Sequence, residues 1–127
     1  MHTNSIDYNQ KFDQILISIH NFNEIWVIDH STTTEEAAGH TGGNSGNGGD
    51  LLYRWGNPET YDAGTTSDRK FFGQHDATWI DEGYPGEGNI LVFNNGVNRP
   101  SSVRLRLPAS SSKPFLFLMR QTQSPRR

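Results

Sequence analysis

Residues 74–96 constrain the fold more than any other stretch, because two strand-like runs lie on either side of a turn-rich segment. Both runs, residues 77–80 and 90–93, consist mainly of β-branched, aromatic and other apolar residues. The link between them contains three glycines and a proline, and Asn-Asn-Gly follows the second run. This order predicts a β-hairpin with a long loop. It also places His75 just before the first strand, at the rim of a sheet.

Other short runs of the same kind recur along the chain, and we expect no helix of ten residues. The further expected strands cover residues 4–8, 15–19, 24–29, 51–55 and 103–107. A short polar turn separates the runs at 15–19 and 24–29, which predicts a second antiparallel hairpin. One helical turn is expected at residues 34–38, and the glycine-dense residues 39–50 are expected to be loop. The predicted fold class is all-β.

A histidine followed by strand, turn and strand occurs twice in the sequence. His2 opens the first copy and His75 opens the second, about 73 positions later. Repeated antiparallel sheets of about four strands are the units of a β-propeller. In that architecture the first strand of each blade lines the central channel, so His2 and His75 would occupy equivalent places. A small β-sandwich whose halves are similar by accident is the alternative.

On the propeller interpretation, residues 1–107 form a partial β-propeller with fewer than two blades. Blade one covers about residues 2–58, and residues 74–107 begin the next blade. Residues 108–127 form a divergent tail that is rich in serine and basic residues. A propeller typically needs four or more blades to close, so we expect a fragment or a chain that cannot close alone. Open blade edges predict self-association.

Composition excludes several classes of function. The net charge is −3, so no basic field favours nucleic acid or an anionic membrane surface. The chain has no cysteine, which excludes disulfides and thiolate chemistry. No apolar run approaches the roughly 18 residues of a membrane span. The N-terminus lacks the basic and apolar regions of a signal peptide, and the compartment is left open.

Five histidines raise the alternative of a metal site, because neutral imidazole is a common ligand. The sequence contains neither HxH nor HExxH, so no metal or other cofactor is expected. The loop at residues 39–50 also lacks the calcium-loop pattern and the Gly-Lys-Ser/Thr phosphate motif. All three tryptophans fall in expected strands and are assigned to blade core rather than to an aryl-binding platform. Asp50 and Arg54 are expected to pair across a blade edge.

Five segments that follow one another in order carry a resemblance to a known family. They are His2-x-Asn4-Ser5 with the residues up to 9, residues 23–33, residues 49–58, Gln74-His75-Asp76 and Phe93-Asn94-Asn95-Gly96. Over about residues 2–103 the chain resembles the bacterial arylsulfotransferases (aryl-sulfate sulfotransferases). The resemblance implies a six-bladed propeller that moves a sulfuryl group from a phenolic sulfate ester to a phenol acceptor, without a nucleotide donor. It also implies a periplasmic or secreted location.

The same resemblance implies roles for individual residues. Family members react by a ping-pong route through a sulfated histidine in the propeller channel. His2 matches the first channel histidine and His75 matches the second, so both are expected to be catalytic. Arg99 is the expected counterpart of the sulfate-binding arginine, and Asn4 and Asn95 are the other expected substrate-binding residues. The nucleophilic histidine lies further along in the family and is expected beyond the last residue of this chain.

These residue types suit sulfuryl transfer. Negative charge spreads over three sulfate oxygens while the leaving phenolate develops charge, and fixed imidazole and guanidinium donors stabilise both. A rim histidine can also be a structural group that bonds to a nearby carbonyl. Two functions therefore stay open. One is a sulfotransferase homologue that holds an anion site without its nucleophile, and the other is a non-catalytic propeller module that binds a ligand or a protein.

Overall fold

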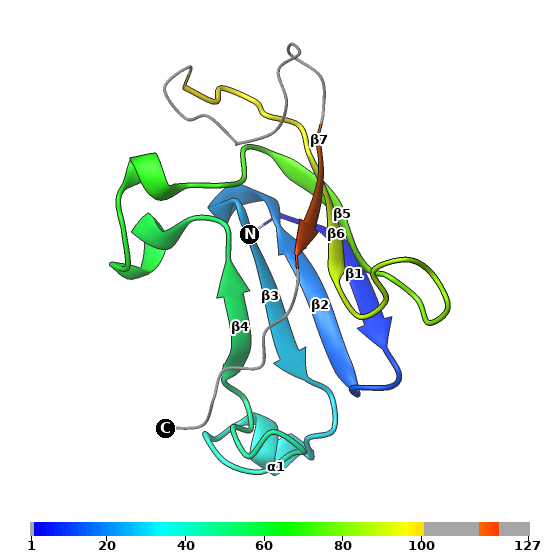
Figure 1. The fold of residues 1–127 in the computed structure, drawn as a ribbon. Helices are drawn as coiled ribbons and strands as arrows, with labels where there is room; N and C mark the ends of the chain where they lie inside the picture. The colour runs from blue at the N-terminus through cyan, green and yellow to red at the C-terminus, as the bar shows by residue number, and fades with distance from the viewer. Residues whose placement is uncertain (1, 101–114, 120–127) are drawn as a thin grey trace.

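A computed structural model of the chain describes residues 2–100 and 115–119, and most of its regular structure is antiparallel strand. One sheet has four strands in chain order: β1 (Thr3–Asn9), β2 (Gln14–Ile19), β3 (Glu24–Asp29) and β4 (Leu51–Trp55). The second sheet has three: β5 (Gln74–Trp79), β6 (Ile90–Asn94) and β7 (Phe115–Met119). Figure 1 shows both sheets, and the all-β prediction is confirmed.

Helical structure in the described part of the chain is confined to short segments. They are η1 (His20–Phe22), α1 (Thr34–Ala37), η2 (Pro58–Tyr61) and η3 (Thr66–Asp68). The helical turn expected near residue 34 is confirmed as α1, which begins with a reciprocal capping box between Thr33 and Glu36. A helical membrane crossing would need a longer and more apolar helix than any in residues 2–100 and 115–119.

Both predicted hairpins are present. β2 pairs with β3 through η1, and the turn closes at Asn23, whose φ of 56° is left-handed. β5 pairs with β6 across the long loop at residues 80–89. The strand expected at residues 103–107 lies outside the described residues. The third strand that pairs with β6 is β7, so this sheet extends into the segment at residues 108–127 that was assigned to the tail.

The first strands of the two sheets, β1 and β5, lie side by side (Figure 1). The Ser5 hydroxyl accepts a hydrogen bond from the Ala77 N–H (2.9 Å), and the Asp7 carboxylate accepts one from the Trp79 N–H (2.6 Å). Side chains of β1 therefore satisfy the edge of β5 that β6 does not pair. Because both contacts advance by two residues along each strand, β1 and β5 run in the same direction.

The hydrophobic core lies between the facing surfaces of the two sheets. Its buried members are Leu16, Ile25, Val27, Phe71, Ala77, Trp79, Ile90 and Val92. They come from β2, β3, β5 and β6, with Phe71 entering from the segment before β5. Trp79 and the half-buried Trp55 belong to this core. Trp26 lies elsewhere, where its ring stacks on Phe22 (5.8 Å between centroids).

The expected pair of Asp50 with Arg54 is wrong. Arg54 binds both carboxylate oxygens of Glu24, with Nη2 at 3.0 Å from Oε1, while Asp50 bonds to His40 (2.7 Å). Trp26 and Arg54 are direct partners across β3 and β4, so Arg54 points along the sheet toward Glu24. Asp50 directly precedes β4 and Arg54 lies within it, so the two residues are separated along one strand by four residues, roughly 13 Å. That separation is too long for an ion pair.

Asp29 closes the glycine-rich loop onto the end of β3. Its carboxylate accepts hydrogen bonds from the backbone N–H groups of Ser31 and Ser45, both at 2.9 Å, and from the Ser31 hydroxyl. Burial opposes ionisation, but these hydrogen bonds outweigh it and lower the pKa of Asp29 from 3.8 to about 2. The loop at residues 39–50 is thus anchored at neutral pH by one buried carboxylate.

Candidate functional site

Three imidazole rings meet at one end of the paired first strands. His20, at the start of η1, contacts both of the other rings. Its ring centroid lies 5.0 Å from that of His2 and 5.4 Å from that of His75. His2 immediately precedes β1 and His75 is the second residue of β5. We call His2, His20 and His75 the histidine cluster. Both histidines predicted from the sequence are therefore brought together, through a third.

The backbone around each strand-opening histidine is irregular. The pairing of β1 with β2 shifts between Thr3 and Ser5, and the pairing of β5 with β6 shifts between His75 and Thr78. Asp76 lies in the second irregularity with a left-handed φ of 51°. Such bulges redirect side chains at the rim of a sheet and are common beside functional sites. Both occur within two or three residues of a cluster histidine.

Gln74 fixes the start of β5 against the first sheet. Its side chain is fully buried, and Nε2 donates to the carbonyl oxygens of Ile19 (3.1 Å) and Glu24 (3.0 Å). In return, Asn4 Nδ2 donates to the carbonyl oxygen of Gln74 (2.7 Å). These bonds connect Gln74, which precedes His75, to Ile19, which precedes His20, and to β1, which follows His2. The mutual placement of the cluster therefore rests on buried, hydrogen-bonded groups.

The turn after β6 docks on the same region. Asn95 Nδ2 donates to the carbonyl oxygen of Gly73 (2.7 Å), and the Val97 N–H donates to that of Phe72 (3.0 Å). Arg99 lies at the end of this turn, where its N–H donates to the Gly96 carbonyl (3.2 Å) and its guanidinium lies next to Gly96. Asn4 and Asn95 thus hold backbone carbonyls just before His75.

Sequence reasoning missed His20. It appeared only as one of five scattered histidines, in a turn between two strands. A signal was available, because the end of an antiparallel strand lies next to the start of its neighbour. Thr3 pairs with Ile19, and the His20 N–H donates to the His2 carbonyl oxygen (2.9 Å). A hairpin register alone would have placed His20 beside His2.

The cluster can offer hydrogen-bond donors to a ligand. Within residues 2–100 and 115–119 no group of three or more histidine, aspartate or glutamate side chains has an arrangement that could hold a metal ion. Each neutral imidazole offers one N–H donor and a protonated one offers two. His20 and His75 are half-buried and His2 is exposed, so a ligand can reach the rings from solvent.

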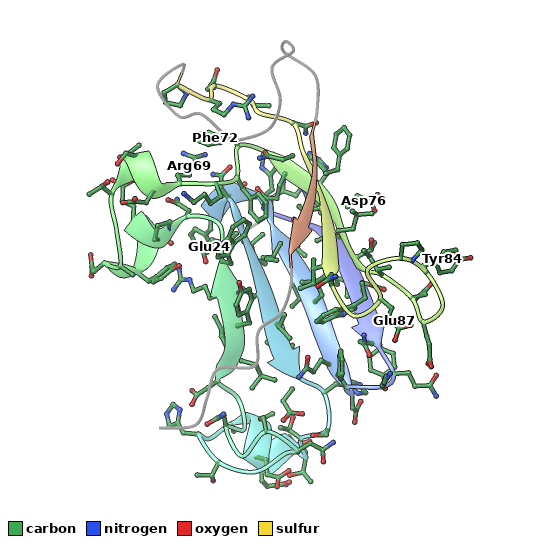
Figure 2. All side chains as sticks on the ribbon, viewed as in Figure 1. Glu24, Arg69, Phe72, Asp76, Tyr84 and Glu87 are labelled. Atoms are coloured by element: carbon green, nitrogen blue, oxygen red, sulfur yellow. The ribbon has the colours of Figure 1, made fainter. Side chains whose placement is uncertain are left out.

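A cavity of about 490 Å³ opens next to His20. Its lining also includes Asn23, Arg69, Gly73 and Asn98. We call it the His20 cavity. Because His20 contacts both other rings of the cluster, the cavity and the cluster adjoin. Figure 2 shows Arg69 and Phe72 close together near the start of β5, away from Tyr84 and Glu87 in the loop at its other end.

Comparison with known proteins agrees with the resemblance seen in the sequence. A family model described as Arylsulfotransferase (ASST) matches residues 1–113. The curated proteins and the solved structures that were compared include no match. The matched range contains the whole histidine cluster, Asn4, Asn95 and Arg99, and it covers well over half of the 127 residues. The chain therefore belongs to the arylsulfotransferase family.

Proposed function

We propose that this chain supplies the sulfate-holding part of an arylsulfotransferase site, with the histidine cluster at its centre. The observation that carries the proposal is the meeting of His2 and His75, which open strands of two different sheets, at the shared neighbour His20. Membership of the family supports a phenolic sulfate ester as donor and a phenol as acceptor.

In the proposed reaction the bond between sulfur and the donor's phenolic oxygen breaks, and the oxygen leaves as phenolate. Sulfur bonds to a histidine nitrogen and then passes to the oxygen of the acceptor phenol, whose proton ends on the released phenolate. His2 and His75 would donate N–H groups to the sulfate oxygens in both steps, where negative charge concentrates. We propose that the histidine that becomes sulfated lies outside these 127 residues.

Three further residues belong to the proposed site. Arg99 would bind the sulfate through its guanidinium, which is suited to forked recognition of an oxyanion. Asn4 and Asn95 donate their amide groups to the carbonyls of Gln74 and Gly73. Their proposed contribution is to hold the backbone on which His75 stands, next to the substrate.

We also propose that the two sheets are units of a β-propeller, as expected for residues 1–107. The parallel contact of β1 with β5 supports this, because first strands of adjacent blades line one channel. The far face of the first sheet adds support. Ile17 pairs with Ile6 and Trp26 on that face, and Ile6 is 70% exposed. A sheet with apolar side chains on both faces is normally covered on both.

The proposal is tested by equilibrium binding. Isothermal titration of the full chain with 4-nitrophenyl sulfate is expected to show binding at least about 10-fold tighter than with phenol, because only the ester offers charged oxygens to the histidines at neutral pH. Absorbance should show no release of nitrophenolate. Equal affinity for the two compounds, or none, would refute the sulfate site. Nitrophenolate release with transfer to phenol would instead place the nucleophile within this chain.

A further inference from the structure

The lining of the His20 cavity includes a positively charged side chain and no negatively charged one. Its lining contains Arg69 and His20, three asparagines, Gly73 and Val97, with no carboxylate. The larger cavity at the other end of β1 and β5, about 570 Å³, differs. It is lined by Asp81, Glu82 and Glu87 against a single cation, Lys11. The two ends of the paired first strands therefore favour ligands of opposite charge.

Arg69 is fixed in place by contacts that leave much of its guanidinium unused. Nε donates to the carbonyl oxygen of Phe71 (2.8 Å), and the guanidinium carbon lies 4.5 Å from the ring centroid of Phe72, a buried side chain. Among the described residues no carboxylate lies within ion-pair distance of it. Arg54 contrasts with it, because its Nε and Nη2 both donate to the carboxylate of Glu24.

Burial lowers the pKa of Arg69, and the negative charge of Glu59 offsets this only in part. An arginine remains charged under such conditions. A half-buried cation with no bonded carboxylate is unfavourable unless an anion compensates it. Arg69 thus presents a positive charge in a fixed orientation, with donors that an anion can bind.

The wall that joins Arg69 to the cluster is closely packed. Gly73 has a left-handed φ of 67°, and its N–H donates to Asn23 Oδ1 (2.8 Å). A Cβ at Gly73 would lie 3.2 Å from Val97 Cγ2 and 3.6 Å from His20 Nε2. His20 Nε2 therefore lies beside this glycine, where the cavity meets the cluster. His20 can contact a group in the cavity or a sulfate at the other two rings.

We propose that the His20 cavity binds an anionic substituent, such as a carboxylate, on the aromatic ring of the phenolic substrate, with Arg69 as its specificity-determining residue. The inference rests on the proposed sulfate site, because it places a second negative group beside the first. About 490 Å³ is ample for one substituted ring. Phenols and phenolic esters that carry a carboxylate would be preferred over unsubstituted ones.

Three ligands separate this inference from the sulfate site in titrations of the full chain. Phenol probes neither anion contact, 4-hydroxybenzoate probes the cavity, and 4-nitrophenyl sulfate probes the cluster. We expect 4-hydroxybenzoate to bind at least about 10-fold tighter than phenol, and Arg69→Gln to remove that advantage, as for loss of a charge-assisted hydrogen bond. Lys70→Gln, the neighbouring change of equal charge, should leave it within about twofold.

The Arg69→Lys variant and urea unfolding show whether Arg69→Gln loses affinity only because its fold is disturbed. Lysine keeps the charge without the fork, so it should retain part of the preference. If 4-hydroxybenzoate binds no better than phenol, or if its advantage survives in Arg69→Gln, the inference is overturned. If 4-nitrophenyl sulfate does not bind while 4-hydroxybenzoate binds through Arg69, the cavity stands as an anion site and the proposed sulfate site falls.

Discussion

Replacing Arg54 by methionine is expected to lower the free energy of unfolding by about 3 kcal/mol, because it leaves a buried carboxylate without its cation. Glu24 is fully buried and is bonded by Arg54, Trp26 and Thr60. Trp26 and Thr60 would remain in the variant, but neither carries a charge. Methionine keeps most of the apolar stem of arginine, so lost packing contributes little. Urea unfolding at neutral pH measures the change.

The pH dependence gives a second readout of the same variant. Burial opposes ionisation of Glu24, but hydrogen bonds from Arg54, Thr60 and Trp26 outweigh it and hold the pKa below 4.5. The stability that this provides is present above the unfolded-state pKa and is lost as pH falls through the folded-state pKa. Without Arg54 the pKa should instead rise, and the variant should gain stability as Glu24 takes up a proton.

The difference between wild type and Arg54→Met is therefore expected to narrow from pH 7 to about pH 4. Lys11→Met is the matched control, because Lys11 is exposed, and it should change stability by less than about 0.5 kcal/mol. A loss below about 1 kcal/mol in Arg54→Met, or a difference that stays constant with pH, would contradict the account of this ion pair.

Replacing His75 by alanine is expected to weaken binding of 4-nitrophenyl sulfate by about 10- to 100-fold, as for loss of one hydrogen bond to a charged group. His75 contacts His20, and its strand is locked to the first sheet through Gln74. The imidazole itself is only half-buried, so its removal should leave the fold intact. Isothermal titration measures the affinity, and urea unfolding checks stability.

His40→Ala is the control for this prediction. The His40 side chain is 85% exposed and bonds to Asp50. Both residues belong to the glycine-rich loop and not to the strands that carry the cluster. Loss of the His40 side chain should leave the affinity within about twofold. An equal loss in the two variants would point to non-specific attraction by positive charge. No loss in His75→Ala would remove that residue from the site.

The strands could be predicted from sequence because their signals are local. Alternating or continuous apolar runs and turn residues identified β2, β3, β4, β5 and β6, and Thr33 with Glu36 marks the start of α1. The partner of Arg54 could not be predicted in this way. It depends on which residues lie opposite one another on neighbouring strands, and the register of β4 against β3 across the glycine-rich connection is not visible in the sequence.

The candidate site was likewise predictable only where its signals are local in the sequence. His2 and His75 stood out because each opens a strand, whereas His20 in the turn between two strands did not. His20 joins the other two only because β2 returns antiparallel to β1 while β5 runs alongside β1. Arg69 was missed for a related reason. Its position beside Phe72 and the cluster comes from the irregular segment between β4 and β5, for which no periodic pattern exists.

The most direct test of the histidine cluster is a nuclear magnetic resonance titration of the five imidazole side chains with phenyl sulfate. His30 and His40 serve as internal references, because each is bonded to a carboxylate, Asp13 or Asp50, outside the cluster. We expect the signals of His2, His20 and His75 to shift together with one dissociation constant, while the two reference signals stay in place. Uniform shifts of all five, or none among the three, would contradict the sulfate site.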